Sequence, residues 1–134
     1  MDSFSKIPLS VDIAESIVTA QFGSQRRLVQ FQELKEGFFN AAALLVLDDG
    51  LKCVLKAAPP AEIKVLRYEK DLMRAEVESM RLVRAQTNVP VPAIYAYDTS
   101  RSILPSEYFL MEALHGAPFH KLYDRLTADQ RDQI

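Results

Sequence analysis

The spacing of apolar residues predicts a helix at the start of the chain. Ile13, Ile17 and Ala20 recur at helical intervals, which indicates an amphipathic helix over residues 11–22. Ser10 precedes this stretch and is a suitable N-cap, because its hydroxyl can accept a hydrogen bond from a free N–H of the first turn. Gly23 follows the last apolar position and is typical of a helix end.

Three strands are predicted next, over residues 28–34, 42–47 and 51–57. The first has apolar residues in phase at Val29 and Phe31 but out of phase at Leu34, so we expect an irregularity near its end. The second is apolar throughout, which predicts that both of its faces are covered. The segment from Asp48 to Gly50 joins the second and third strands, and Asp-Gly is typical of a tight hairpin turn.

The second half of the chain predicts a long helix, two more strands and helical remnants. Apolar residues recur at helical spacing over residues 68–85, and the prolines at 90 and 92 end that helix. Residues 93–97 and 107–111 are strand-like, residues 119–126 favour a short helix, and Thr127 is a cap for another. The predicted class is α+β: a five-stranded antiparallel sheet, one packed helix, an N-terminal helix and a C-terminal helical remnant.

The composition of the chain limits the classes of binding partner and the cellular location that we expect. The 134 residues include 16 basic and 18 acidic ones, a net charge of −2 that gives no indication of nucleic-acid or membrane-surface binding. Cys53 is the only cysteine, so we expect no disulfide and no cysteine metal cluster. The longest apolar run, residues 41–47, is far shorter than the ~20 residues of a membrane-spanning helix. With no signal-peptide core at the N-terminus, the expected location is cytoplasmic.

Lys56 is the strongest candidate for chemistry. It follows Val54 and Leu55 at the end of a strand and therefore lies near the core. A buried ammonium without a counter-charge costs several kcal/mol, roughly, so Lys56 needs a carboxylate partner. A lysine at a strand end can instead extend its ammonium into water, and the sequence leaves both interpretations open.

Glu76 is the predicted counter-charge for Lys56. It borders the apolar stripe of the long helix and lies in the middle of that helix, where the backbone is rigid. Glu69 lies on the same face and competes for this role. An exposed ion pair of Glu76 with Arg81 or Lys70 is the other interpretation that stays open.

Two backbone segments are candidates for binding a ligand. Gly37 and Asn40 lie in the loop between the first two strands, where a glycine lets the backbone approach a phosphate closely. A single glycine in such a loop is more often an ordinary turn. The fifth strand ends in a connector before Gly116, whose free backbone groups could recognise an adenine edge; a plain edge strand is equally compatible with the sequence.

Five short motifs, in order, resemble the small lobe of the aminoglycoside phosphotransferase and choline-kinase-like family, which has a protein-kinase-like fold. They are Gly37-x-x-Asn40, Val54-Leu55-Lys56, Glu76-x-x-x-Met80-x-x-Val83, Val89-Pro90-Val91-Pro92 and Phe109-Leu110-Met111-Glu112-x-x-x-Gly116. The resemblance implies three segments: an N-terminal helix extension (1–24), the nucleotide-binding small lobe (25–116) and the start of a truncated helical lobe (117–134).

The resemblance also implies roles for individual residues. Lys56 would bind the α- and β-phosphates of ATP, and Glu76 would orient Lys56. Met111 would lie at the back of the adenine pocket, and the backbone of Glu112 and Leu114 would bond the adenine.

The family's catalytic loop is not matched. His115-Gly116 begins like its His-Gly-Asp motif, but Ala117 stands in place of the catalytic Asp and Leu122 in place of the Asn. The resemblance therefore implies no catalytic residue and no metal ligand in this chain, with the large lobe absent. Mg²⁺ and a small-molecule acceptor would bind only if a C-terminal lobe is present.

The predicted function is the nucleotide-binding lobe of an ATP-dependent small-molecule phosphotransferase, inactive alone. A non-catalytic interaction module is the alternative. Its exposed lobe face would pair with a partner chain or with a second copy, since a large apolar patch invites association. A small α+β domain without any nucleotide role is the third hypothesis.

Overall fold

The computed structural model describes residues 7–34, 41–59, 72–114 and 125–133. The elements follow the predicted order of helix, three strands, helix, two strands and a terminal helix. Their bounds are α1 (Val11–Phe22), β1 (Leu28–Leu34), β2 (Ala41–Leu47), β3 (Lys52–Ala57), α2 (Leu72–Gln86), β4 (Ile94–Asp98), β5 (Tyr108–Glu112) and α4 (Ala128–Asp132). The predicted helical residues 68–71 and 119–124 lie outside the described residues.

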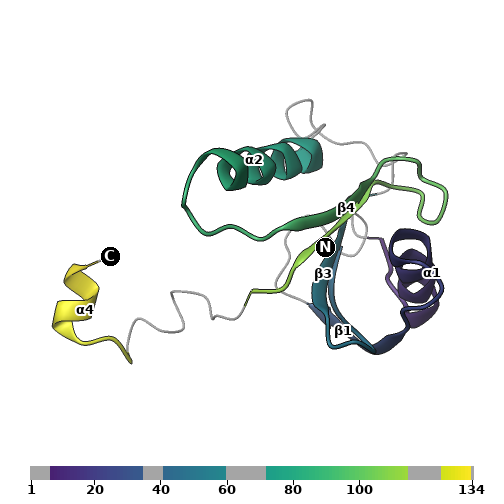
Figure 1. The fold of residues 1–134 in the computed structure, drawn as a ribbon, viewed down its shortest axis with the longest axis horizontal. Coiled ribbons are helices and arrows are strands. Elements are labelled where there is room, and N and C mark those ends of the chain that lie inside the picture. Colours follow the sequence, from purple (N-terminus) through teal and green to yellow (C-terminus); the bar gives the residue numbers. More distant parts are fainter. Residues whose placement is uncertain (1–6, 35–40, 60–71, 115–124, 134) are drawn as a thin grey trace.

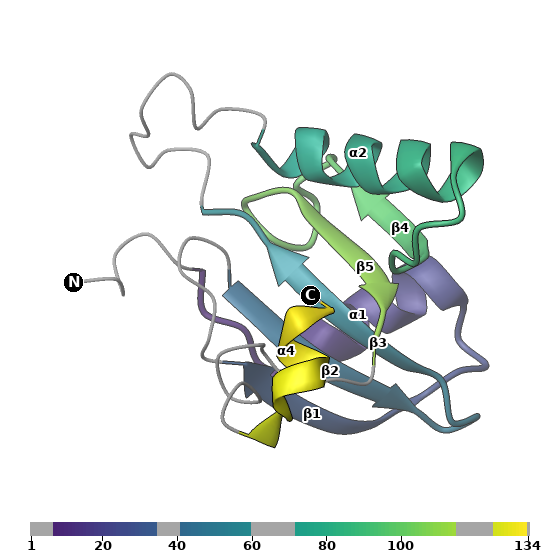
Figure 2. The ribbon, with the colours of Figure 1, turned by 90° about the vertical axis from the view of Figure 1, so that its left-hand side faces the viewer.

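The five strands form one antiparallel sheet, which confirms the predicted α+β class. Their spatial order is β1-β2-β3-β5-β4, so β3 lies at the centre and β1 and β4 form the two edges (Figure 2). Asp48 to Gly50 make the predicted tight connection between β2 and β3, and Gly50 has a φ of 91°, which a glycine accepts without strain. β3 and β5 are therefore direct neighbours, although the long helix and β4 separate them in sequence.

A helix lies on each face of the sheet (Figure 1). The α1 face holds the larger core, because every second residue of β2 and β3 points toward α1 and is buried. Cys53 is part of this core, and burial raises the pKa of its thiol to about 11. The thiol therefore packs as a small apolar group, as its sequence context predicts. The buried side chains of α1 and of the three inner strands β2, β3 and β5 that meet here are Ala14, Ile17, Val18, Ala43, Leu45, Leu47, Cys53, Leu55, Ala57 and Leu110.

The α2 face holds a smaller core that covers only part of the sheet. Met73 and Val77 of α2 and Phe109 of β5 are buried together. Ile94, Tyr97 and Met111 pack around them at partial exposure. Figure 2 shows α2 above β4 and β5, with β1 and β2 at the opposite edge of the sheet. The β2 part of this face is consequently left partly open.

The prediction that β2 is covered on both faces is therefore wrong. Its residues alternate between buried and half-buried, with Ala42, Leu44 and Val46 half-buried on the α2 side. A wholly apolar strand is buried on both faces only where a helix covers each face of the sheet. Here α2 lies over the far half of the sheet, so the second apolar face of β2 remains partly accessible.

The irregularity of β1 lies at its start, so the prediction that it lies near the end of this strand is wrong. The register between β1 and β2 shifts between Leu28 and Gln30, and Val29 is 62% exposed. A bulge inserts one extra residue and changes the face on which the following side chains lie. Leu28 and Phe31 both pack against the α1-side core as a result.

A polar contact joins α1 to β4 and β5. The Gln21 amide donates to Oδ2 of Asp98 and to the Tyr108 hydroxyl, at 2.9 Å each, and the Tyr108 hydroxyl donates to Asp98 at 3.2 Å. Hydrogen bonds from the Ser100 side chain and backbone, followed by those from Tyr108 and Gln21, hold the pKa of the Asp98 carboxyl below its usual value. The charged form of Asp98 is therefore the form that the fold stabilises.

This lowered pKa predicts a pH-dependent contribution of Asp98 to stability. A carboxylate with a depressed pKa stabilises the fold above its ordinary pKa, 3.8 for this group, and the contribution is lost as the pH falls through the folded-state pKa. The free energies of unfolding in urea of the wild type and of Asp98→Asn should converge as the pH falls below about 4. Parallel pH profiles for the two proteins would contradict this role.

Candidate functional site

The ammonium of Lys56 contacts both carboxylate oxygens of Glu76. The Nζ–Oε1 and Nζ–Oε2 distances are 2.8 and 2.5 Å, and the side chains remain 25% and 31% exposed. The predicted contact between these residues, which are 20 positions apart in sequence, is therefore present. The pair is partly shielded from water yet open on one side, so its charge remains accessible to a ligand.

Local structure explains why the two side chains meet. Along β3, alternate residues point to opposite faces, so Leu55 enters the α1-side core while Val54 and Lys56 face α2. On α2, Glu76 lies beside the buried Met73 and Val77 at spacings of three and one. Burial of these two apolar residues fixes the rotation of α2, which aims the Glu76 carboxylate at the sheet.

Phe109 is a third member of this site that the sequence analysis did not identify. It lies directly opposite Lys56 in the β3–β5 ladder and is fully buried. The Lys56 Nζ lies 5.5 Å from the centroid of its ring, within the range of a cation–π interaction. Only the strand register reveals this contact, because the two residues are 53 positions apart in sequence and give no local signal.

An apolar strip of the sheet lies next to the ion pair. Val54, Leu44 and Ala42 share the α2-side face with Lys56 and are half-buried, because α2 lies over β4 and β5 instead. Met111 lies opposite Val54 on the neighbouring strand, also half-buried, and packs against the α2-side core. The site thus combines a cation at one end with a partly open apolar surface beside it, which suits a ligand that has a flat apolar group and an anionic group.

Backbone groups at the end of β5 lie on the β4 side of that strand, close to the site. The Ala113 N–H donates to the Lys52 carbonyl at 3.3 Å, so Glu112, one residue earlier, turns its own N–H and carbonyl away from β3. Leu114 lies two residues beyond the end of β5, and its side chain is 59% exposed. The Glu112 carbonyl therefore faces this edge, about three strand residues or roughly 10 Å from Lys56.

The structure places five of the seven predicted site residues, Lys56, Glu76, Met111, Glu112 and Leu114, around this strip. Gly37 and Asn40 lie outside the described residues, as do Glu69, the competing partner, and the motif from His115 to Leu122. Within the described ranges, no group of three or more His, Cys, Asp or Glu side chains is arranged to hold a metal ion. None of the described helices combines the length and the hydropathy needed to cross a bilayer.

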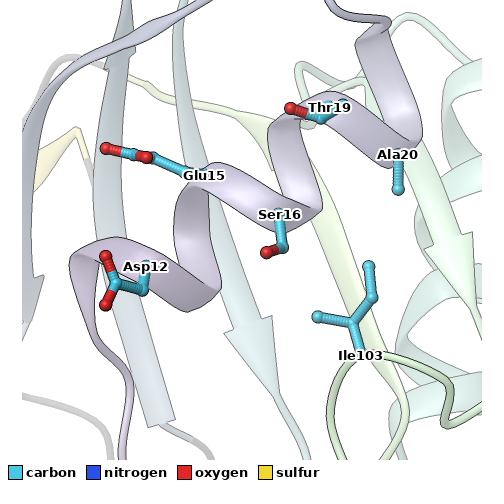
Figure 3. Close-up of a pocket in the computed structure, with 6 residues that line it drawn as sticks. All are labelled: Asp12, Glu15, Ser16, Thr19, Ala20 and Ile103. Atoms are coloured by element: carbon cyan, nitrogen blue, oxygen red, sulfur yellow. The ribbon is translucent and has the colours of Figure 1, made fainter.

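A separate hollow of about 610 Å³ lies on the outer side of α1 (Figure 3). Asp12, Glu15, Ser16, Thr19 and Ala20 of α1 line it together with Ile103 from the β4–β5 connection. α1 covers the face of the sheet opposite to Lys56, so this hollow is distinct from the ion-pair site. Its two carboxylates would repel phosphates, which makes it unsuited to a nucleotide.

Comparison with models of protein families shows which family the chain matches. The model of the phosphotransferase enzyme family matches residues 30–134, most of the chain. This match confirms the resemblance inferred from the five motifs. The described site residues all lie inside the matched region.

Two curated proteins are also similar to the chain. Two subtelomeric hrmA-associated cluster proteins, from two strains of Aspergillus fumigatus, are each 29% identical over 103 residues, covering 76% of this chain and 19% of the relative. The chain thus spans about a fifth of the length of the curated relatives it matches.

Solved structures share the fold. A candidate aminoglycoside phosphotransferase from Ralstonia eutropha JMP134 superposes with a TM-score of 0.59 at 22% identity, covering 82% of this chain and 29% of that one. A candidate fructosamine-3-kinase from Thermobifida fusca YX-ER1 gives 0.56 at 21% identity, covering 78% and 32%. In each comparison this chain covers well under half of the larger protein, which agrees with a match to one lobe of a kinase-like fold.

The geometry of the ion pair predicts energetic coupling between Lys56 and Glu76. In a double-mutant cycle with Lys56→Met and Glu76→Gln, the coupling free energy of unfolding should be about 1 kcal/mol, because a half-buried pair is only partly screened by water. Glu78→Gln is the matched control, since Glu78 is 69% exposed on the same helix, and it should change stability by less than about 0.5 kcal/mol. Additive effects of the two site substitutions would show that the contact contributes no net stability.

Proposed function

Because the chain belongs to the phosphotransferase enzyme family, we propose that its sheet and α2 form a nucleotide-binding lobe and that the phosphates of ATP bind at Lys56. The observation that carries this proposal is the ion pair between Lys56 and Glu76. A carboxylate that holds a lysine ammonium in a fixed place at the edge of an open apolar strip is the arrangement that kinase-like folds use for phosphates.

Each part of the strip has a role in this proposal. An ammonium has three protons, and Glu76 takes up two of them, so the third can point to a phosphate oxygen. The half-buried side chains of Val54, Leu44 and Met111 offer an apolar surface to the base. The Glu112 carbonyl and the Leu114 N–H match the donor and acceptor on the edge of adenine.

The reaction that this lobe would serve is ATP-dependent phosphoryl transfer to a hydroxyl group of a small molecule. The family resemblance assigns the general base, the Mg²⁺ ligands and the acceptor pocket to a large lobe. The proposal for this chain alone is therefore nucleotide binding without turnover. Binding should be weak, because one lobe supplies only part of the contacts to the ligand.

Calorimetric titration with ATP tests the proposed role of Lys56. Lys56→Met should weaken ATP binding by about tenfold or more, because it removes a charge-assisted hydrogen bond to phosphate. Arg81→Met is the control: it removes one positive charge from an exposed position of α2 and should leave the affinity nearly unchanged. Two results would overturn the proposal: no ATP binding by the wild type at millimolar ligand, or equal affinities for the wild type and Lys56→Met.

A further inference from the structure

At the end of the ladder between β4 and β5, a side-chain oxygen takes the place of a backbone carbonyl as hydrogen-bond acceptor. Ile94 pairs with Met111, so the next pair outward is Ala93 with Glu112. In a hydrogen-bonded antiparallel pair, each residue donates its N–H to the carbonyl of the other. The first of these bonds is present, from the Glu112 N–H to the Ala93 carbonyl at 2.8 Å. The second is not, because the Ala93 N–H donates to the side-chain Oε1 of Glu112 at 3.1 Å.

This substitution changes what the Glu112 main chain can do. The Ala93 N–H is partly buried and needs an acceptor, and the nearest alternative in the ladder is the Glu112 carbonyl. The Glu112 carboxylate meets that need itself. The Glu112 carbonyl does not bond to β3 either, because the strand alternation turns it away from that strand. Within the described part of the chain, this carbonyl therefore keeps its acceptor capacity.

We propose that the Glu112 side chain is a positioning residue for base recognition: by binding the Ala93 N–H, it reserves its own main-chain carbonyl for the amino group of a purine. This inference rests on the proposed nucleotide-binding function. An amino group at position 6 of the purine, as in adenine, can donate to a carbonyl. The 6-oxo group of guanine would face that carbonyl as a second acceptor and would be repelled. The side chain thus supports selection of ATP over GTP.

Variants of Glu112 separate the acceptor from the charge. Glu112→Gln retains a side-chain oxygen at the same reach and removes the charge. Glu112→Met has similar length but no comparable acceptor, so the Ala93 N–H would turn to the carbonyl of residue 112. A carbonyl has two lone pairs, so competition of this kind should weaken base binding without abolishing it.

The experiment measures affinities for ATP, GTP and inorganic tripolyphosphate by calorimetry for the wild type and both variants. We expect Glu112→Met to weaken ATP binding by about tenfold, to reduce the ratio of ATP to GTP affinity, and to leave tripolyphosphate binding unchanged. Glu112→Gln should restore the wild-type ratio. Amide hydrogen exchange at Ala93, measured by NMR without ligand, should be similarly slow in all three proteins if the N–H finds the carbonyl in Glu112→Met.

The outcomes distinguish this inference from the function on which it rests. A wild type that binds neither ATP nor tripolyphosphate overturns the proposed function and this inference together. A wild type that prefers ATP, with the same preference in Glu112→Met, overturns only the role of the Glu112 side chain. Equal losses in Glu112→Gln and Glu112→Met would mean that the charge matters and the acceptor does not, which also overturns it.

Discussion

The site depends on the ion pair between the central strand and the long helix. Lys56 cannot place its ammonium near the core without a counter-charge, and Glu76 supplies one from an element that begins far along the chain. Phe109 adds a favourable ring face on the neighbouring strand. One cation thus connects β3, α2 and β5, and the positions of all three elements define the place that we propose for the phosphates.

The two faces of the sheet differ in how completely helices cover them. The α1 face is closed: its apolar residues are buried, and Gln21 joins the helix to Asp98 and Tyr108. The α2 face is covered over β4 and β5 only, which leaves a strip beside Lys56 partly exposed. Stability is thus concentrated on the closed face, where burial of apolar area is largest. The open face can carry a polar pair and backbone groups that a ligand can reach.

Local patterns in the sequence were sufficient to predict most of the secondary structure. The bounds of α1 and β1 match those predicted, because a cap, a glycine and a clear apolar period mark them. The position of the bulge in β1 and the half-open face of β2 were predicted wrongly, since both depend on where helices pack in three dimensions. The need of Lys56 for a carboxylate partner was predictable from the cost of an unpaired charge, and the mid-helix position of Glu76 favoured it over Glu69. The contact with Phe109 and the bond to Ala93 depend on strand register, for which the sequence contains no local signal.

The backbone hydrogen bonds of the sheet do not depend on particular side chains, so this lobe can share its fold with proteins that differ from it in sequence. The solved structures share its fold at 22% and 21% identity. A carbonyl or N–H at a strand end is available in any sequence that keeps the strand path. What must be kept is the balance of donors and acceptors at the end of the ladder. In this chain, the Glu112 carboxylate maintains that balance, because it satisfies the Ala93 N–H and leaves the adjacent carbonyl available.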